Sequence, residues 1–248
     1  MKLNKKIAIV TGGASGFGAG IVKKFAEEGA IVVIADLNIE LATSLADEIG
    51  DNSLAIEVDV ANGESVKSMV DNVMEKYGTI DIVVNNAGIG HIPQPLDELC
   101  ETVFDRIFEV NAKSVFNMAQ FIVPIMKKAG SGAILNVAST GGVSPRPNLT
   151  WYNASKGWMI TATRGMAVEL APFGIRVNAI NPVAGDTPLL KTFMGEDTPE
   201  IREKFLSTIP IGRFSTPEDM GNAACFLCSD DASMVTGVAM EVDGGRCI

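Results

Sequence analysis

Two side chains with complementary acid–base chemistry, Tyr152 and Lys156, stand four residues apart in the sequence. On a helix this spacing places them one turn apart on the same face, so that an ammonium group lies beside a phenol. A phenol with a pKa near ~10 is a weak base at neutral pH, but a neighbouring positive charge stabilises the phenolate and lowers that pKa. The spacing predicts a proton-transfer pair, although an isolated pair of this type is more often an exposed Tyr and Lys on a helix.

A glycine-rich turn lies far upstream, directly after the first apolar run of the chain. Because glycine has no Cβ, the backbone at Gly12, Gly16 and Gly18 can approach a pyrophosphate closely. The N-terminus of the following helix would present unpaired N–H groups to the same anion. The turn therefore predicts phosphate binding, and tight packing of a helix on a strand is the alternative reading.

Asp36 ends the second apolar run, about twenty residues after the turn, where an acid can accept hydrogen bonds from the adenosine ribose. Its charge repels a 2′-phosphate, and neither Leu37 nor Asn38 supplies a compensating cation. We expect NAD to be preferred over NADP. The alternative is that Asp36 only caps the following loop.

Short β-branched runs alternate with helical patterns along the chain, which is typical of parallel βαβ units. Seven strands are predicted, at residues 7–10, 31–35, 54–58, 82–84, 134–137, 175–180 and 238–242. We expect an α/β fold with a Rossmann-type doubly wound, seven-stranded parallel sheet, helices on both faces and a single domain over residues 1–248. A late helix has a clear start, because Thr216 can cap it and Pro217 suits its first position.

Composition limits the classes of function. The chain has 248 residues and 47% hydrophobic content, yet no apolar run approaches the roughly 20 residues of a membrane span. No hydrophobic segment of secretory length follows the start, so we expect a cytoplasmic protein without membrane contact. Thirty acidic and twenty basic residues give a net charge of −10. The basic residues are scattered along the sequence, which argues against nucleic acid as a partner.

The cysteines and the single histidine offer little chemistry by themselves. Cys225 and Cys228 are three residues apart among apolar neighbours, and no second pair completes a metal site, so we expect them in the core and expect no metal. His91 lies in a loop that could face a substrate, although a lone loop histidine is more often solvated.

Taken in order, these motifs resemble the short-chain dehydrogenase/reductase family over essentially the whole chain. The glycine turn resembles the family's TGxxxGxG segment, Asp59-Val60 its adenine-contacting pair, and Asn85-Asn86-Ala87-Gly88 its NNAG segment. The resemblance implies Asn111, Ser139, Tyr152 and Lys156 as catalytic residues. It also implies a nicotinamide coenzyme site formed by Gly12, Ser15, Gly16, Phe17, Gly18, Asp36, Leu37, Asp59, Val60, Asn86, Ala87, Gly88, Tyr152, Lys156, Pro182, Val183, Gly185 and Thr187.

The same resemblance implies a role for each catalytic residue. Tyr152 exchanges a proton with the substrate oxygen, which Ser139 holds through its hydroxyl. Lys156 lowers the pKa of Tyr152 and binds the nicotinamide ribose. Asn111 interrupts its helix locally and positions water that leads protons from Lys156 to solvent.

One segment departs from the family pattern. Residues 181–188 resemble the family's NPGxxxTP stretch over the nicotinamide, but Val183 replaces the usual glycine and Gly185 stands where a branched residue often packs. Thr187 is retained. The residues that follow, about 189–210, resemble the family's mobile substrate lid.

The resemblance is closest to 3-oxoacyl-[acyl-carrier-protein] reductases, so the first expectation is an NADH-dependent 3-oxoacyl thioester reductase. The alternative is a dehydrogenase of a small cyclic, aromatic or sugar-like secondary alcohol, and a remote one is a non-catalytic scaffold that senses NAD. Leu149 replaces a polar residue, and positions Ala129 and Phe173 lack the basic residues often used to dock an acidic carrier. Acyl carrier protein is therefore a doubtful partner. It remains an alternative because Lys127, Lys128 and Arg146 are basic residues that could bind an acidic carrier. The resemblance also implies a homotetramer, formed through the helices around 98–128 and 151–171 and through the C-terminal strand.

Overall fold

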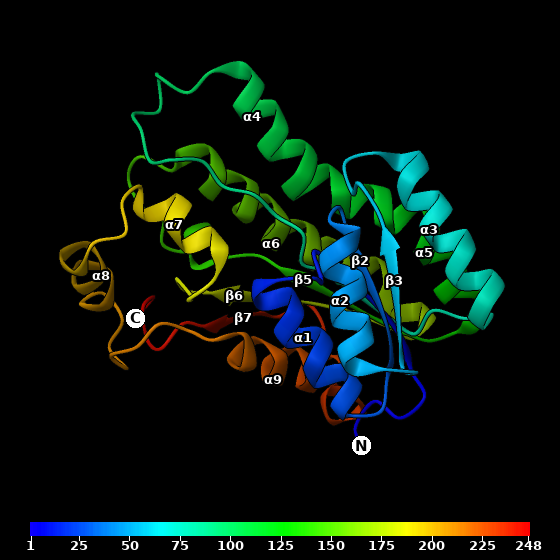
Figure 1. The fold of residues 1–248 in the computed structure, drawn as a ribbon. Coiled ribbons are helices and arrows are strands. Elements are labelled where there is room, and N and C mark those ends of the chain that lie inside the picture. Colours follow the sequence, from blue (N-terminus) through cyan, green and yellow to red (C-terminus); the bar gives the residue numbers. More distant parts are fainter.

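The computed structural model describes residues 1–248, and its centre is a parallel sheet of seven strands in the order β3-β2-β1-β4-β5-β6-β7 (Figure 1). The strands are β1 (Ile7–Thr11), β2 (Ile31–Asp36), β3 (Ser53–Glu57), β4 (Ile82–Asn85), β5 (Gly132–Val137), β6 (Ile175–Pro182) and β7 (Ala239–Val242). All seven predicted strands and the doubly wound α/β fold class are confirmed.

Helices follow the strands as the βαβ pattern predicts. They are α1 (Gly16–Glu27), α2 (Ile39–Ile49), α3 (Gly63–Tyr77), α4 (Glu101–Phe108), α5 (Ser114–Ala129), α6 (Thr150–Leu170), α7 (Pro188–Met194), α8 (Pro199–Leu206) and α9 (Pro217–Cys228). A π-helical segment, Glu109–Lys113, joins α4 to α5. No helix is long and apolar enough to cross a membrane.

Two apolar layers enclose the sheet, because successive strand residues point to opposite faces. Ala8 and Val10 of β1 belong to the layer that contains the buried faces of α1, α2 and α9. Ile7 and Ile9 belong to the other layer, with the buried faces of α3, α5 and α6. Figure 1 shows these two groups of helices on either side of the sheet.

Strand order changes direction between β1 and β4, which pair directly although β2 and β3 separate them in sequence. In such sheets a crevice opens beyond the carboxyl ends of the strands at this point, because the following connections diverge to opposite faces. The glycine turn follows β1, and Asn86 follows β4. Both therefore lie at the crevice.

The late helix begins where the sequence predicts. Thr216 Oγ1 accepts a hydrogen bond from Asp219 N, and the Asp219 carboxylate accepts one from Thr216 N, which forms a capping box. Gly20 allows α9 to pack closely on α1, since a Cβ there would overlap Pro217 O. The helices α7 and α8 project from one side of the molecule (Figure 1). They are formed by the segment that was predicted as a lid.

Candidate active site

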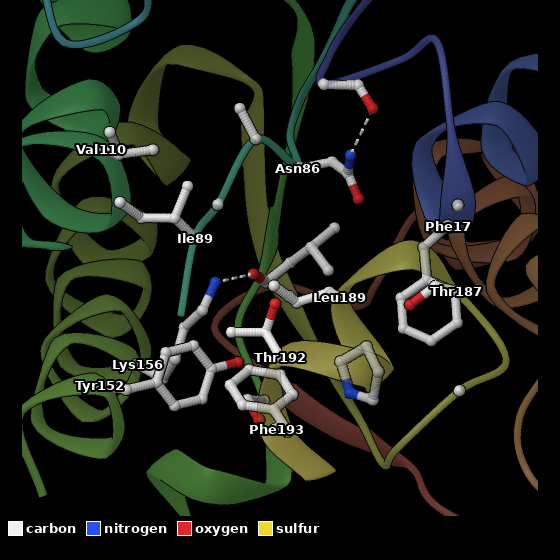
Figure 2. A pocket seen from close by; sticks show the side chains of 18 of the residues that line it. Phe17, Asn86, Ile89, Val110, Tyr152, Lys156, Thr187, Leu189, Thr192 and Phe193 are labelled. Carbon is white, nitrogen blue, oxygen red and sulfur yellow. Dashed lines mark hydrogen bonds between the residues drawn. The ribbon is translucent and has the colours of Figure 1, made fainter. Parts of the chain in front are cut away.

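Tyr152 and Lys156 lie one turn apart on α6 and face into the molecule, where they are 7% and 4% exposed. The reading of an exposed Tyr and Lys is therefore wrong. Lys156 Nζ donates a hydrogen bond to Val137 O at 2.9 Å and lies 6.0 Å from the centre of the Tyr152 ring (Figure 2). Ser139 follows β5, and its side chain lines the same cavity as Tyr152.

Burial controls the protonation of this pair. It raises the pKa of Tyr152 to about 12, and the Ser139 hydroxyl acts in the opposite direction. It lowers the pKa of Lys156 to about 8. The expected lowering of the Tyr152 pKa by Lys156 is wrong for this structure, because burial disfavours the phenolate and Lys156 Nζ is hydrogen-bonded to Val137 O. Tyr152 therefore carries its proton at neutral pH and is suited to donate it.

Asn111 lies in the π-helical segment, so the predicted interruption of its helix is confirmed. Its Oδ1 accepts a hydrogen bond from Ile89 N, and its Nδ2 donates to Ile89 O and to Ser155 Oγ. A Cβ at Gly88 would lie 3.3 Å from both Asn111 Oδ1 and Lys156 Nζ, so the two polar groups flank the same glycine. Asn111 thereby fixes the NNAG segment against α6.

One cavity of about 510 Å³ joins the predicted site residues. Its lining includes Ser139, Tyr152 and Lys156, and also Gly12, Ser15, Gly16, Phe17, Asp36, Leu37, Asp59, Val60, Asn86, Ala87, Gly88, Pro182, Val183, Gly185 and Thr187. Two predicted residues do not line it. Asn111 is fully buried behind Ile89, and Gly18 packs against the turn, where a Cβ would overlap Gly12 O. Tight packing, the alternative reading of the turn, thus holds for Gly18.

Asp36 caps the loop that follows it and also lines the cavity. Its Oδ1 accepts a hydrogen bond from Asn38 N and its Oδ2 one from Ala14 N, each at 3.0 Å, so it does cap the following loop. The same carboxylate lines the cavity, and a carboxylate oxygen can accept more than one hydrogen bond. Loop capping therefore leaves acceptor capacity for a ligand hydroxyl.

The departure at residues 183–185 has a packing cause. A Cβ at Gly185 would overlap the Phe17 ring and lie 2.9 Å from Ser215 O, so the ring occupies the volume that a branched residue would fill. Val183 is buried, and its carbonyl accepts a hydrogen bond from Ser215 Oγ at 3.2 Å. Figure 2 shows Phe17 beside Thr187, at the start of α7.

Several cavity residues escaped the sequence analysis, and the most important are aromatic. Phe193 of α7 packs on the Tyr152 ring with the ring centres 4.8 Å apart (Figure 2). Phe205 of α8 lines the same cavity. Both fall inside the predicted lid, but nothing in the sequence indicates which lid residues face inward. We call the part of the cavity formed by Arg146, Leu149, Leu189, Phe193 and Phe205 the aromatic wall, and the part formed by the turns after β1 to β4 the glycine-turn wall.

The histidine and cysteine expectations have separate outcomes. His91 is 6% exposed and does not line the cavity, so the solvated reading is wrong. Its Nδ1 donates to Ile92 O at 2.9 Å. Cys225 and Cys228 are buried in the core as predicted. The structure holds no group of three or more His, Cys, Asp or Glu side chains arranged for a metal ion.

Known proteins match this arrangement along the whole chain. The family model described as enoyl-(acyl carrier protein) reductase matches residues 12–246. The 4-formylbenzenesulfonate dehydrogenase of Comamonas testosteroni is 50% identical, with all of both chains covered. This chain belongs to the short-chain dehydrogenase/reductase family. It is an oxidoreductase of the kind that acts on alcohol and carbonyl groups.

Two further members of the short-chain dehydrogenase/reductase family extend the comparison. The 3-oxoacyl-[acyl-carrier-protein] reductase of Thermotoga maritima is 41% identical, with all of both chains covered. A crystal structure of 3-ketoacyl-(acyl-carrier-protein) reductase from Brucella melitensis, complexed with NADH, superposes with a TM-score of 0.95 at 50% identity and covers 99% of this chain and 100% of that one. Family members use a nicotinamide coenzyme.

The cavity suits such a coenzyme on chemical grounds. Its glycine-turn wall brings a helix N-terminus, Gly12 and Asp36 to one side. A Cβ at Gly12 would lie 2.9 Å from Ala87 Cα, so this corner admits only bare backbone. Backbone N–H groups, a helix terminus and a carboxylate are the groups that hold a pyrophosphate and an adenosine ribose.

Proposed function

We propose that this enzyme interconverts a secondary alcohol and its ketone with NAD(H). The observation that carries the proposal is that the buried Tyr152 and the hydroxyl-bearing Ser139 line the same cavity as the glycine turn. A proton donor and a second hydroxyl at one point can hold and protonate a single carbonyl oxygen.

Each residue then has one task. Ser139 holds the substrate oxygen, and Tyr152 donates a proton to it during reduction or removes one during oxidation. Lys156 orients the ribose beside Gly88, and Asn111 keeps that segment in place through Ile89. The bound coenzyme supplies or accepts the hydride. The alcohol thus loses one hydride and one proton, and the balance needs no metal.

Preference for NAD over NADP is part of the proposal. Asp36 places a negative charge at the ribose position, and the neighbouring Leu37 is exposed and uncharged. A 2′-phosphate near this carboxylate would meet repulsion of several kcal/mol at intermediate dielectric, on the order of 10²-fold or more in binding. The complex of the Brucella relative with NADH agrees with this choice.

A compact ring-bearing alcohol suits the aromatic wall best. Leu149 is buried and lines the cavity, and the Phe193 ring packs on Tyr152, so apolar surfaces border the reacting oxygen. Such surfaces favour a ring over a heavily hydroxylated sugar. The name of the Comamonas relative also describes a ring compound.

A 3-oxoacyl thioester is the second candidate, favoured by the names of the Thermotoga and Brucella relatives. The position of Arg146 and the net charge of the chain weaken an acyl carrier protein as its carrier. Lys127 Nζ lies 4.3 Å from the centre of the Phe173 ring, and Arg146 lines the cavity. Arg146 is therefore not a free surface cation, whereas Lys127 and Lys128 are exposed. A chain of net charge −10 would slow encounter with an acidic carrier.

The deciding experiment measures steady-state oxidation of NADH and NADPH with a panel of cyclic and aromatic ketones beside acetoacetyl-CoA. Turnover of ring ketones with NADH supports the proposal. Turnover of the thioester alone favours the second candidate, and preference for NADPH contradicts the role of Asp36. Tight NADH binding without turnover of any ketone would favour a sensing scaffold.

We also propose a homotetramer in which α4, α5 and α6 meet a second copy. Phe116 of α5 is 54% exposed and Val168 of α6 is 78% exposed, and both are large apolar side chains. No atom lies within 4 Å of a Cβ built at Gly165, so a neighbouring helix could approach there. Light scattering that gives the mass of one chain would contradict this assembly.

A further inference from the structure

An arginine without a carboxylate partner lines the aromatic wall. Arg146 stands six residues before Tyr152, and both side chains line the same cavity. Its guanidinium stacks on Phe205 of α8, 4.5 Å from the ring centre. Its one side-chain hydrogen bond within the protein runs from Nη2 to Thr208 Oγ1 at 3.5 Å. Since a guanidinium has five N–H donors, most of its donor capacity is unused.

A second guanidinium lies close by and increases the local positive charge. Arg246, near the C-terminus, donates from Nη1 to Ser144 Oγ at 3.4 Å, and its buried Nε has no partner. Burial first, and then the charge of Arg246, lower the pKa of Arg146. No carboxylate lies within ion-pair distance of either arginine, whereas Arg106, Arg202 and Arg213 each have one. Arg164 and Arg176 also lack one, but Arg164 is exposed and Arg176 donates to three backbone carbonyls.

This arrangement is unfavourable in the protein alone. Two like charges in a partly buried, apolar setting each lose hydration, and neither is compensated by an acid. An anion that enters the cavity would remove that imbalance. The planar fork of arginine matches the two oxygens of a carboxylate or sulfonate, so it would fix both charge and orientation.

We propose that Arg146 binds a carboxylate or sulfonate carried by the substrate, so that the enzyme selects ring alcohols and ketones with an anionic substituent remote from the reacting carbon. The proposal rests on the proposed function, because it assigns the far end of the same substrate. Tyr152 would act on the oxygen at one end of the ring while Arg146 holds the other. Arg246, which does not line the cavity, adds to the positive potential at Arg146.

The test uses two substrates of nearly equal shape, 4-acetylbenzoate and 4′-methylacetophenone, with NADH. The measured quantity is the ratio of kcat/KM for the anionic ketone to that for the neutral one. A charge-assisted hydrogen bond lost on truncation predicts that Arg146→Gln lowers this ratio about 10- to 100-fold, mainly through KM of the anionic ketone. Arg146→Lys should give a smaller loss, since it keeps the charge but not the fork.

The matched control is Arg164→Gln, which removes the same charge from an exposed position of α6 outside the cavity. It should leave the ratio unchanged. An unchanged ratio in Arg146→Gln, or an equal fall in the control, would overturn the proposal. If Arg146→Gln instead loses only turnover of acetoacetyl-CoA, the arginine serves the phosphates of a thioester and the proposal fails.

Failure of the proposed function would look different, because wild-type enzyme would then turn over neither ketone. Calorimetric titration of the NADH-bound enzyme with the unreactive 4-methylbenzenesulfonate still decides the inference in that case. Binding that Arg146→Gln weakens at least 10-fold and Arg164→Gln does not would support the anion site. Binding that is absent, or equal in the two variants, would reject it.

Discussion

The glycine-turn wall and the aromatic wall of the cavity are built by different means. The first consists of backbone and short polar side chains that directly follow β1 to β4, held by hydrogen bonds such as those of Asp36 and Asn86. The second consists of large side chains from a loop and from α7 and α8, held by ring contacts such as those of Phe193 and Phe205. A fixed backbone wall suits a shared coenzyme, whereas a wall of side chains can change its substrate by substitution.

Tyr152 stands between the two walls, and its removal should have the largest effect. Tyr152→Phe keeps the ring that packs on Phe193 but removes the proton donor. We expect kcat to fall about 10²- to 10⁴-fold, while NADH binding, measured by fluorescence titration, stays near the wild-type value. An unchanged kcat would contradict the role of Tyr152 in proton transfer. A loss of NADH binding together with kcat would contradict the separation between proton transfer and coenzyme binding.

The protonation of Tyr152 predicts opposite pH responses in the two directions. Because burial raises its pKa to about 12, the form that donates a proton is fully present at neutral pH, while the form that accepts one increases with pH. We expect kcat/KM for alcohol oxidation to rise from pH 7 to pH 9, by up to about tenfold per unit, and that for ketone reduction to stay level or fall. An oxidation profile that is flat over this range would show that Tyr152 is not the limiting base.

Asp36 tests the glycine-turn wall alone. Asp36→Asn removes the charge but keeps an oxygen that can accept the hydrogen bond from Ala14 N. We expect the ratio of kcat/KM with NADH to that with NADPH to fall on the order of 10²-fold. The preference between anionic and neutral ketones should not change, and a change in it would mean that the two walls do not act separately.

Gly185 and Phe17 connect the two walls, since Gly185 precedes α7 and Phe17 lies on α1. A Cβ at Gly185 would overlap the Phe17 ring, so Gly185→Ala should lower the free energy of unfolding by about 1–3 kcal/mol and weaken NADH binding. Phe17→Leu should offset part of this loss, because the shorter side chain vacates the overlap. Thermal unfolding and NADH titration of both single variants and the double variant give the coupling. Additive effects would show that the two residues are independent.

These two walls also mark what the sequence predicts and what it does not. The strands, the glycine turn, Asp36 and the Tyr152–Lys156 pair were predictable, because each depends on spacing along a single element. Phe193, Phe205 and the packing of Phe17 on Gly185 were not, because those contacts depend on how remote segments meet in space. The direction of the Tyr152 pKa shift was also missed, since spacing gives the neighbouring charge but not the depth of burial.

The smallest expected effect concerns Thr216, which supports the glycine-turn wall from a distance through the packing of α9 on α1. Thr216→Ala removes the hydroxyl that accepts a hydrogen bond from Asp219 N, and such a cap contributes about 1 kcal/mol. We expect chemical denaturation to show that loss, and Thr216→Ser to restore most of it because serine keeps the oxygen. Both variants should retain wild-type coenzyme and substrate preferences. A shift in substrate preference would mean that the aromatic wall depends on the position of α9, because the segment from α8 to Thr216 would then transmit the change to Phe205.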